Sequence, residues 1–342
     1  MVRMNSLPAV AITASMISNG GVFVGAERYT VYFIRHADSI WNAHKDKTEV
    51  SEEQVKAEFK LDRCPVYDVA NITPLGQIVR DVPIQKRSLK QAALMTVMQS
   101  YLDAQLSPRG VWQSQCLAKW ISQNCEPEGL GTLEDDVRTD VCRLAGMRDR
   151  DRAVLAASNL KRTQQTMLTA LAYFCGYGTG GSSSYLHTIH AYDFLQERGC
   201  APDARPNLAD RGVGHAIGNC QIDLHREFSQ DICLLSEVEQ NNVFDKFVGY
   251  VNQLGASRES NKPIFYVTGH SSWLQDFFKL KLPDSLGDDT PNNLEINLTR
   301  VKLGNASVIK FFLEIDNGDI STAKIVPNHT KLIYGYLKAE KH

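Results

Sequence analysis

The chain has 342 residues, of which 43% are hydrophobic and 8% aromatic, which is enough for a substantial buried core. Its formal net charge of -2 leaves no global excess of positive charge, so nucleic acid and membrane surfaces are not expected partners. The apolar stretch from Leu7 to Ile17 is interrupted by polar residues and is too short to span a bilayer, so neither a signal peptide nor a membrane anchor is predicted there.

The eight cysteines are scattered, without a Cys-x-x-Cys pair or a zinc-like Cys/His spacing. We therefore expect reduced thiols in a cytoplasmic protein. Residues 1–28 are interpreted as an N-terminal extension and residues 29–342 as one domain. Charged, proline-rich and glycine-rich stretches predict irregular insertions in that domain around 43–102 and 199–230.

Strand-forming runs alternate with segments of helical periodicity along the chain. The predicted strands, rich in Val, Ile, Phe and Tyr, cover residues 30–34, 154–157, 264–268 and 307–315. Helices are predicted to begin near Ser88, after Gly110, at Asn159 with Ser158 as its N-cap, and at a Ser272-x-x-Gln275 capping box. This alternation predicts an α/β fold with a mostly parallel sheet that helices cover on both faces.

Charged side chains follow three of these strands at the point where each strand ends. Arg35 and His36 follow the first strand, Arg162 the second and His270 the third. Ligands of parallel sheets bind outside the carboxyl ends of the strands. If the three strands are neighbours, we expect these four side chains to converge on one crevice.

The four side chains suit phosphoryl transfer. During this reaction charge spreads over three equatorial oxygens, and the planar guanidinium groups of Arg35 and Arg162 can each hold two oxygens. A neutral imidazole carries a lone pair, so His36 is the candidate nucleophile that forms a phosphohistidine. His270 would be a further donor to the equatorial oxygens.

The leaving alkoxide needs a proton, so a carboxylic acid must stand close to these residues. Glu197 is our candidate for this acid, and Asp193 and Glu227 compete with it. Asp38 is a weaker candidate, because the neighbouring positive charges are expected to keep it ionised.

Six short motifs resemble, in the same order, those of the histidine phosphatase (phosphoglycerate mutase-like) superfamily. They are Arg35-His36-Ala37-Asp38-Ser39-Ile40-Trp41-Asn42, Leu106-Ser107-Pro108-Arg109-Gly110-Val111-Trp112-Gln113, Ser158-x-Leu160-x-Arg162-x-x-x-Thr166, Leu195-Gln196-Glu197, His270 after its strand, and Asn305-Ala306-Ser307. The resemblance implies a three-layer α/β/α fold, a phosphohistidine intermediate and no metal. We assign catalysis to His36, Glu197 and His270, and phosphate binding to Arg35, Asn42, Arg162, His270 and Ser271.

Departures from the family pattern refine this assignment. Ala37 replaces the usual Gly of the first motif, which is tolerable only if its backbone avoids positive φ. Ser271 and Ser272 follow His270 where the family has Gly or, in the acid phosphatase branch, an adjacent Asp. The acid must then come from elsewhere, which favours Glu197. The chain also lacks the Arg/Tyr/Pro-rich segment of the mutases, so a phosphatase is favoured over a mutase.

The predicted function is therefore hydrolysis of a phosphomonoester, on a small phosphorylated metabolite or a phosphoprotein, without a cofactor. Two alternatives remain open at this point. One is phosphoryl transfer of the phosphoglycerate mutase type, and the other is a non-catalytic protein that binds a phosphorylated ligand as a scaffold.

Two further patterns are interpreted as structural. The G-x-G-x-x-G sequence from Gly176 to Gly181 follows a helix and precedes serines, whereas a dinucleotide loop follows a strand and opens a helix. The pair His187-x-x-His190 lacks a third ligand nearby in the sequence, so no metal site is predicted there.

Overall fold

The computed structural model describes residues 25–45, 103–125, 134–175, 187–197, 216–217, 220–225, 227–228, 235–258, 261–283 and 294–338. The helix predicted near Ser88, most of the insertion at 43–102 and the glycine-rich sequence at 176–181 lie outside these residues.

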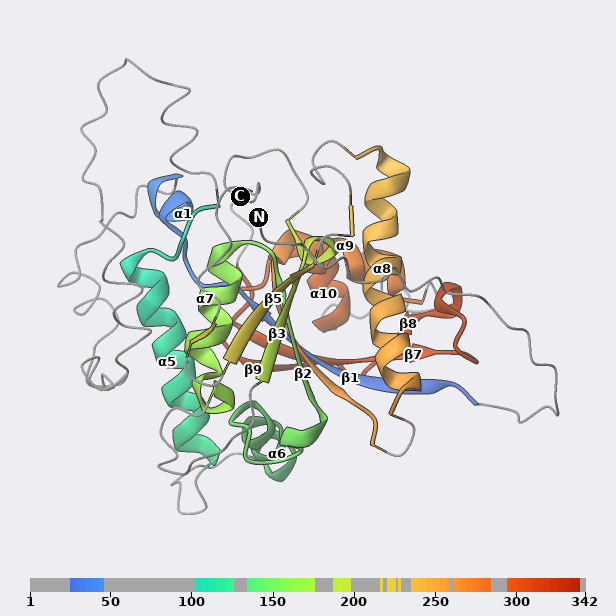
Figure 1. The fold of residues 1–342 in the computed structure, drawn as a ribbon, viewed down its shortest axis with the longest axis horizontal. Coiled ribbons are helices and arrows are strands. Elements are labelled where there is room, and N and C mark those ends of the chain that lie inside the picture. The colour runs from blue at the N-terminus through green and yellow to red at the C-terminus, as the bar shows by residue number, and fades with distance from the viewer. Residues whose placement is uncertain are drawn as a thin grey trace, which may run out of the picture.

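One mixed sheet organises the described part of the chain (Figure 1). Its strand order is β4-β5-β3-β2-β6-β1-β7-β8, and β9 pairs with β7. The strands are β1 (Glu27–Arg35), β2 (Ala153–Ser158), β3 (His187–Tyr192), β4 (Ala216–Ile217), β5 (Cys220–His225), β6 (Ile264–Gly269), β7 (Val308–Ile315), β8 (Lys324–Ile325) and β9 (Lys331–Tyr334). The neighbours β5, β3, β2, β6 and β1 run parallel, and antiparallel pairs extend both edges.

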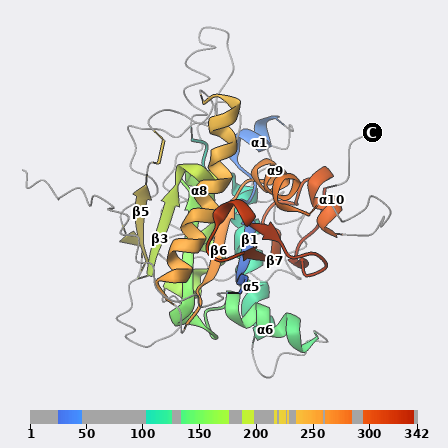
Figure 2. The same cartoon turned by 90° about the vertical axis from the view of Figure 1, so that its right-hand side faces the viewer.

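Helices cover both faces of the sheet (Figure 1, Figure 2). They are α1 (Ile40–Lys45), α5 (Pro108–Cys125), α6 (Asp135–Leu144), α7 (Lys161–Ala170), α8 (Glu237–Ala256), α9 (Ser271–Lys281) and α10 (Leu294–Arg300). Short 3-10 turns are η1 (Arg150–Arg152), η2 (Ala172–Cys175), η3 (Asp193–Leu195) and η6 (Ile320–Thr322).

Alternate residues of β1 enter two separate hydrophobic cores. Val31 and Phe33 pack in the core that α8, α9 and α10 share, whereas Tyr32 and Ile34 pack in the core formed with α5, α6 and α7. Side chains that alternate along a strand point to opposite faces, so a strand that is apolar at every position requires cover on both sides. The three-layer α/β/α fold with a mostly parallel central sheet is thereby confirmed.

The strands predicted at 30–34, 154–157, 264–268 and 307–315 all form, as β1, β2, β6 and β7. The part of the segment 199–230 that the structure describes contains β4 and β5, which the sequence analysis did not predict. β5 pairs with β3 in the parallel part of the sheet.

Two predicted helix caps are wrong. Ser158 is still the last residue of β2, and Leu160 is the N-cap of α7, so that helix begins two residues later than predicted. The N-cap of α9 is His270, not Ser272. In both places the helix follows the strand closely, and the serine hydroxyl has another partner. Ser158 contacts His270, and Ser272 donates to Glu197.

The prediction of reduced thiols is also wrong. Cys125 at the end of α5 and Cys142 in α6 form a disulfide with a Cα–Cα distance of 4.8 Å, and Cys116 is disulfide-bonded as well. The packing of α6 against α5 creates this proximity, which the scattered spacing does not reveal. Disulfides persist mainly in oxidising compartments. Reduced thiols therefore no longer support the predicted cytoplasmic location.

Of the helices that the structure describes, none combines the length and the apolar character needed to cross a lipid bilayer.

Candidate active site

Four neighbouring parallel strands end at the candidate site. Arg35 is the last residue of β1 and His36 follows it, while His270 follows β6, which lies between β1 and β2. Arg162 stands in the first turn of α7, directly after β2. Glu197 follows η3 at the end of β3. The sheet order therefore places residues that are up to 235 positions apart at one edge of the sheet.

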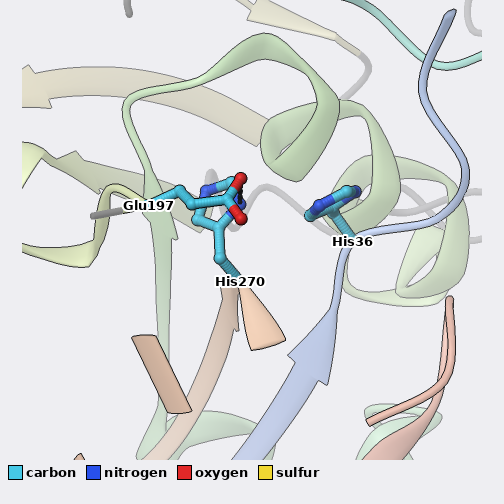
Figure 3. Close-up of side chains that lie close together, drawn as sticks. All are labelled: His36, Glu197 and His270. Atoms are coloured by element: carbon cyan, nitrogen blue, oxygen red, sulfur yellow. Dashed lines mark ion pairs between the residues drawn. The ribbon is translucent and has the colours of Figure 1, made fainter. Parts of the chain in front are cut away.

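Contacts join these side chains into one cluster. Arg162 Nη2 donates to Glu197 Oε2 over 2.9 Å, and His270 Nδ1 lies 3.5 Å from the same carboxylate oxygen. The ring centroids of His36 and His270 are 5.0 Å apart. Figure 3 shows the side chains of His36, Glu197 and His270 close together. The expected convergence is thus present in the structure, whereas the role of each residue stays a prediction.

Hydrogen bonds hold the ring of His36 in place. Its backbone N–H donates to the carbonyl of Gly269 over 3.0 Å, which ties it to the end of β6. The ring Nδ1 lies 2.6 Å from the carbonyl oxygen of Ala37. A carbonyl only accepts, so Nδ1 carries the hydrogen and Nε2 keeps its lone pair.

Burial lowers the pKa of His36 well below its usual value, and the charges of Arg162 and Arg35 lower it further. Only 3% of this residue is exposed. The imidazole is therefore neutral at physiological pH, which is the state in which it can act as a nucleophile.

His270 is fully buried between two polar partners. Its Nε2 lies 3.2 Å from the hydroxyl of Ser158, and its Nδ1 faces Arg162 Nη2 at 3.5 Å. Burial lowers the pKa of His270 well below its usual value, with Arg162 and Arg35 contributing in the same direction. Ser158, interpreted from the sequence as a helix cap, instead orients this histidine.

The two arginines supply positive charge that water does not reach. Arg162 is fully buried and Arg35 is 6% exposed. Arg35 donates from its guanidinium to the carbonyl of Leu303, while its Nε has no hydrogen-bond partner in the described part of the chain. Burial lowers the pKa of Arg35 to about 10. This value is still well above neutral pH, so the guanidinium keeps its positive charge although it is buried. A buried cation with an unused donor is a natural partner for an anion.

The carboxylate of Glu197 is held by opposing effects. Burial raises its pKa, but the charge of Arg162, a hydrogen bond from Ser272 and the charge of Arg35 lower it by more. The Ser272 hydroxyl donates to Oε1 over 3.1 Å. The net pKa is below the ordinary value, so Glu197 is ionised in the free protein.

The competing carboxylates hold other parts of the structure together. Asp193 Oδ2 accepts from the backbone N–H groups of Glu227 and Phe228, at 2.9 Å and 3.0 Å. The side chain of Glu227 accepts from Lys246 of α8 over 3.2 Å. Glu197, unlike these two carboxylates, contacts both Arg162 and His270.

Asp38 connects the loop after β1 to the segment 106–113. Its Oδ2 accepts from Ser107 Oγ over 2.8 Å, and its backbone N–H donates to Gln113 Oε1 over the same distance. A Cβ at Gly110 would lie 1.9 Å from the carbonyl oxygen of Asp38, so only glycine permits this approach. The carboxylate of Asp38 therefore positions the loop that follows His36.

Thr166 supports that same loop from α7. Its hydroxyl accepts from Ala37 N–H over 3.0 Å and donates to the carbonyl of Arg162 over 2.7 Å. Ala37 is not among the described non-glycine residues with positive φ, so the condition for replacing the family's glycine is met. The sequence motif contained Thr166, but only the structure shows that it links His36's neighbour to the arginine.

The remaining two predicted phosphate ligands are Asn42 and Ser271. Asn42 is in α1, and its backbone N–H donates to the Ser39 hydroxyl over 3.1 Å. Ser271 begins α9 beside His270, is 4% exposed, and its hydroxyl has no partner among the described residues. A buried hydroxyl without a partner is compatible with the role predicted for Ser271, and phosphate binding by Asn42 stays a prediction.

The ligand atoms of His36, Glu197 and His270 all lie within 4.8 Å of one another, which is also a spacing that could hold a metal ion. Two buried guanidinium groups act on the same position, however, and like charge opposes a bound cation. The electrostatics of this cluster favour an anion.

No protein-family model matches the sequence, and no curated protein is significantly similar to it. Similar solved structures include an ecdysone phosphate phosphatase from Bombix mori in complex with tungstate, with 13% identity and a TM-score of 0.39, covering 92% of this chain and 98% of that chain. A mycobacterial glucosyl-3-phosphoglycerate phosphatase has 12% identity and a TM-score of 0.36, covering 89% and 98%. A phosphoserine phosphatase from Entamoeba histolytica has 11% identity and a TM-score of 0.32, covering 83% and 90%.

All three are phosphatases, the class of enzyme that the sequence motifs resemble. At identities and TM-scores this low, the reaction has to follow from the side chains of the site and not from the likeness.

Proposed function

We propose that the protein hydrolyses phosphate monoesters through a phosphohistidine formed on His36. The observation that carries this proposal is the state of the His36 ring. Its Nδ1–H is directed to the Ala37 carbonyl, its pKa is lowered by burial, and Nε2 keeps a lone pair beside two buried guanidinium groups. A neutral nucleophile next to fixed positive charge suits attack on an anionic phosphate ester.

In the first step the Nε2 lone pair forms a bond to phosphorus as the bond from phosphorus to the ester oxygen breaks. Arg35 and Arg162 hold the equatorial oxygens while charge spreads over them. Glu197 gives its proton to the leaving oxygen. In the second step water attacks phosphorus, Glu197 takes the water's proton, and His36 is released together with inorganic phosphate.

The lowered pKa of Glu197 has to be reconciled with its role as an acid. The Arg162 charge that keeps this carboxylate ionised is shared with the phosphate once the substrate binds, and the phosphate adds negative charge nearby. Both changes raise the pKa of Glu197 in the complex. The proton therefore arrives with the substrate and resides on Glu197 when the ester bond breaks.

The substrate class is a small phosphorylated metabolite or a phosphoprotein, and neither a cofactor nor a nucleic acid is required. Two observations favour hydrolysis over the alternatives. A carboxylate stands in the cluster, which a scaffold that had lost its acid would lack. The Glu197 side chain is also 28% exposed, so water reaches the group that would activate it, whereas a mutase needs a dry pocket.

The test compares wild type, His36→Ala and His187→Gln with p-nitrophenyl phosphate as substrate. His187 is a matched control because it lies in β3 and accepts from Arg150 over 3.1 Å, outside the cluster. We expect turnover to vanish in His36→Ala and persist in His187→Gln. Rapidly quenched wild-type protein should carry a phosphoryl group on His36 by mass spectrometry.

Full turnover in His36→Ala would refute the proposed nucleophile. Binding of p-nitrophenyl phosphate without any turnover would favour the scaffold alternative. Transfer of the phosphoryl group to an added alcohol in preference to water would favour the mutase.

A further inference from the structure

A second group of titratable side chains lies in the sheet and has no part in the proposed reaction. It consists of His190 in β3 and of Asp223 and His225 in β5. These two strands are parallel neighbours, as Figure 1 shows. In the sequence, the pair His187-x-x-His190 lacks a third ligand nearby. In the structure the two histidines have different partners. His187 accepts a hydrogen bond from Arg150, whereas His190 contacts His225 of β5.

Strand register places the three side chains on one face. His190 is the partner of Asp223, and Tyr192 is the partner of His225. Partners in register project to the same side of a sheet, and so do residues two apart on one strand. The convergence of His190, Asp223 and His225 is therefore a property of the backbone pairing.

Distances between the ligand atoms suit a transition metal. His190 Nδ1 lies 3.1 Å from His225 Nε2, which lies 3.2 Å from Asp223 Oδ2. All three ligand atoms lie within 4.8 Å of one another. Two ligands about 2.0 Å from a tetrahedral Zn²⁺ are about 3.3 Å apart. The two short edges of the group therefore come close to the geometry of a zinc site.

One hydrogen on His225 Nε2 cannot make good hydrogen bonds to both Asp223 and His190. His225 Nε2 faces both Asp223 and His190 and can carry only one hydrogen, which lies in the plane of the ring. A cation at the centre would accept electron pairs from all three atoms at once. Two imidazoles and one carboxylate form a ligand set that Zn²⁺ uses, with a position left for water.

Aromatic packing orients one of the ligands in advance. The ring of His225 stacks on Tyr192, with centroids 4.4 Å apart and an interplanar angle of 16°. Tyr192 in turn stacks on Phe194 of the hydrophobic core at 4.4 Å. The His225 ring is therefore fixed by its neighbours in the core, which lowers the cost of ordering it around a metal.

We propose that His190, Asp223 and His225 form a site for a divalent transition metal of the Zn²⁺ type, which ties β5 to β3. Unlike the cluster of His36, Glu197 and His270, this group has no hydrogen bond or ion pair to an arginine or lysine among the described residues. Among the described residues, no positive side chain in direct contact with this group therefore opposes a bound cation.

The test is titration of the apo protein with Zn²⁺ by calorimetry, combined with measurement of Tm. The variants are His190→Gln and Asp223→Asn, and His187→Gln on the same strand is the matched control. His270→Gln addresses Zn²⁺ binding at the candidate active site. Circular dichroism confirms that each variant is folded.

We expect Zn²⁺ to bind the wild type and to raise its Tm. Loss of a metal-orienting neighbour typically weakens binding 10- to 100-fold, so loss of a direct ligand should weaken it by at least about 100-fold in His190→Gln and Asp223→Asn. The controls His187→Gln and His270→Gln should bind as the wild type does. Absence of wild-type binding, or binding that His270→Gln removes and His190→Gln retains, would overturn the proposal.

Discussion

Arg162 and Glu197 form an ion pair at the ends of neighbouring strands, with Nη2 2.9 Å from Oε2, and the guanidinium is fully buried while the carboxylate is 28% exposed. A phosphate that entered this site would face the arginine and displace part of its attraction for the carboxylate. The pair thus couples the binding of an anion to the protonation of the proposed acid.

Replacement of Arg162 with Ala should cripple turnover, because the transition state loses a donor that neutralises its charge. Arginines that act on a transferring phosphoryl group contribute about 10³- to 10⁵-fold to the rate, so we expect a loss of at least about 10³-fold in kcat/KM. The measurement is steady-state hydrolysis of p-nitrophenyl phosphate. Arg162→Lys, which keeps the charge but not the planar fork, should fall between wild type and Arg162→Ala. Equal activity of Arg162→Ala and wild type would exclude this role.

Replacement of Glu197 with Gln should harm substrates according to their leaving groups. An alkoxide needs the proton that Gln cannot give, whereas p-nitrophenolate leaves without one. General acid catalysis contributes about 10²- to 10⁴-fold, so that loss is expected with an alkyl phosphate and a much smaller loss with p-nitrophenyl phosphate. The comparison uses the same variant with both substrates. If alkyl phosphate hydrolysis were untouched, the acid would have to be another group.

The pH dependence of kcat/KM should show a falling limb on the alkaline side. Because burial holds the pKa of His36 well below its usual value, protonation of that imidazole is not expected to limit activity near neutral pH. The pKa of Glu197 is lowered in the free protein, so its proton must come with a monoanionic substrate. The second pKa of a phosphate ester is about 6, so kcat/KM should fall about tenfold per pH unit above that value.

This alkaline limb should flatten in Glu197→Gln, because the variant no longer uses the proton. A pH–rate profile measured with an alkyl phosphate, whose leaving group needs the proton, distinguishes the two cases when both proteins are compared. The idea fails if the limb keeps the same slope in the variant.

Replacement of Gly110 with Ala should disturb both stability and activity. The new methyl group would lie 1.9 Å from the carbonyl oxygen of Asp38, and the loop after His36 would have to move. Overpacking of this kind costs about 1–3 kcal/mol, which urea denaturation can measure. Gly249→Ala in α8 is the matched control, since no atom lies within 4 Å of the added carbon, and it should be neutral or slightly stabilising. Similar midpoints for the two variants would contradict the close approach.

Removal of the Cys125–Cys142 disulfide should lower stability. The two residues are 17 apart in the sequence, and closing a loop of about 15 residues is worth about 3 kcal/mol in the unfolded-state model. The double variant Cys125→Ala/Cys142→Ala should therefore unfold at a lower urea concentration, with activity retained in the folded protein. An unchanged midpoint in the double variant would mean that the bond contributes nothing.

Local patterns in the sequence were sufficient to predict the core of the sheet and the residues at its edge. The apolar runs of β1, β2, β6 and β7 determine the strands, because a parallel strand buried on both faces is apolar at almost every position. The polar residues directly after them, from Arg35 and His36 to His270, follow from the same boundaries. Their chemistry is a property of the side chains, so phosphoryl transfer could be inferred before any geometry.

Only the tertiary structure decided which side chains meet. Ser158 and Ser272 were read as helix caps, but their hydroxyls contact His270 and Glu197 across strand boundaries. Among the candidate acids, the contact with Arg162 distinguishes Glu197 from Asp193 and Glu227. The packing of α6 against α5 brings Cys125 and Cys142 together.

The partners of His190 likewise come from β5, a strand that the sequence analysis did not predict. Such pairings depend on strand order and register, which bring together residues far apart along the chain and which no local periodicity encodes.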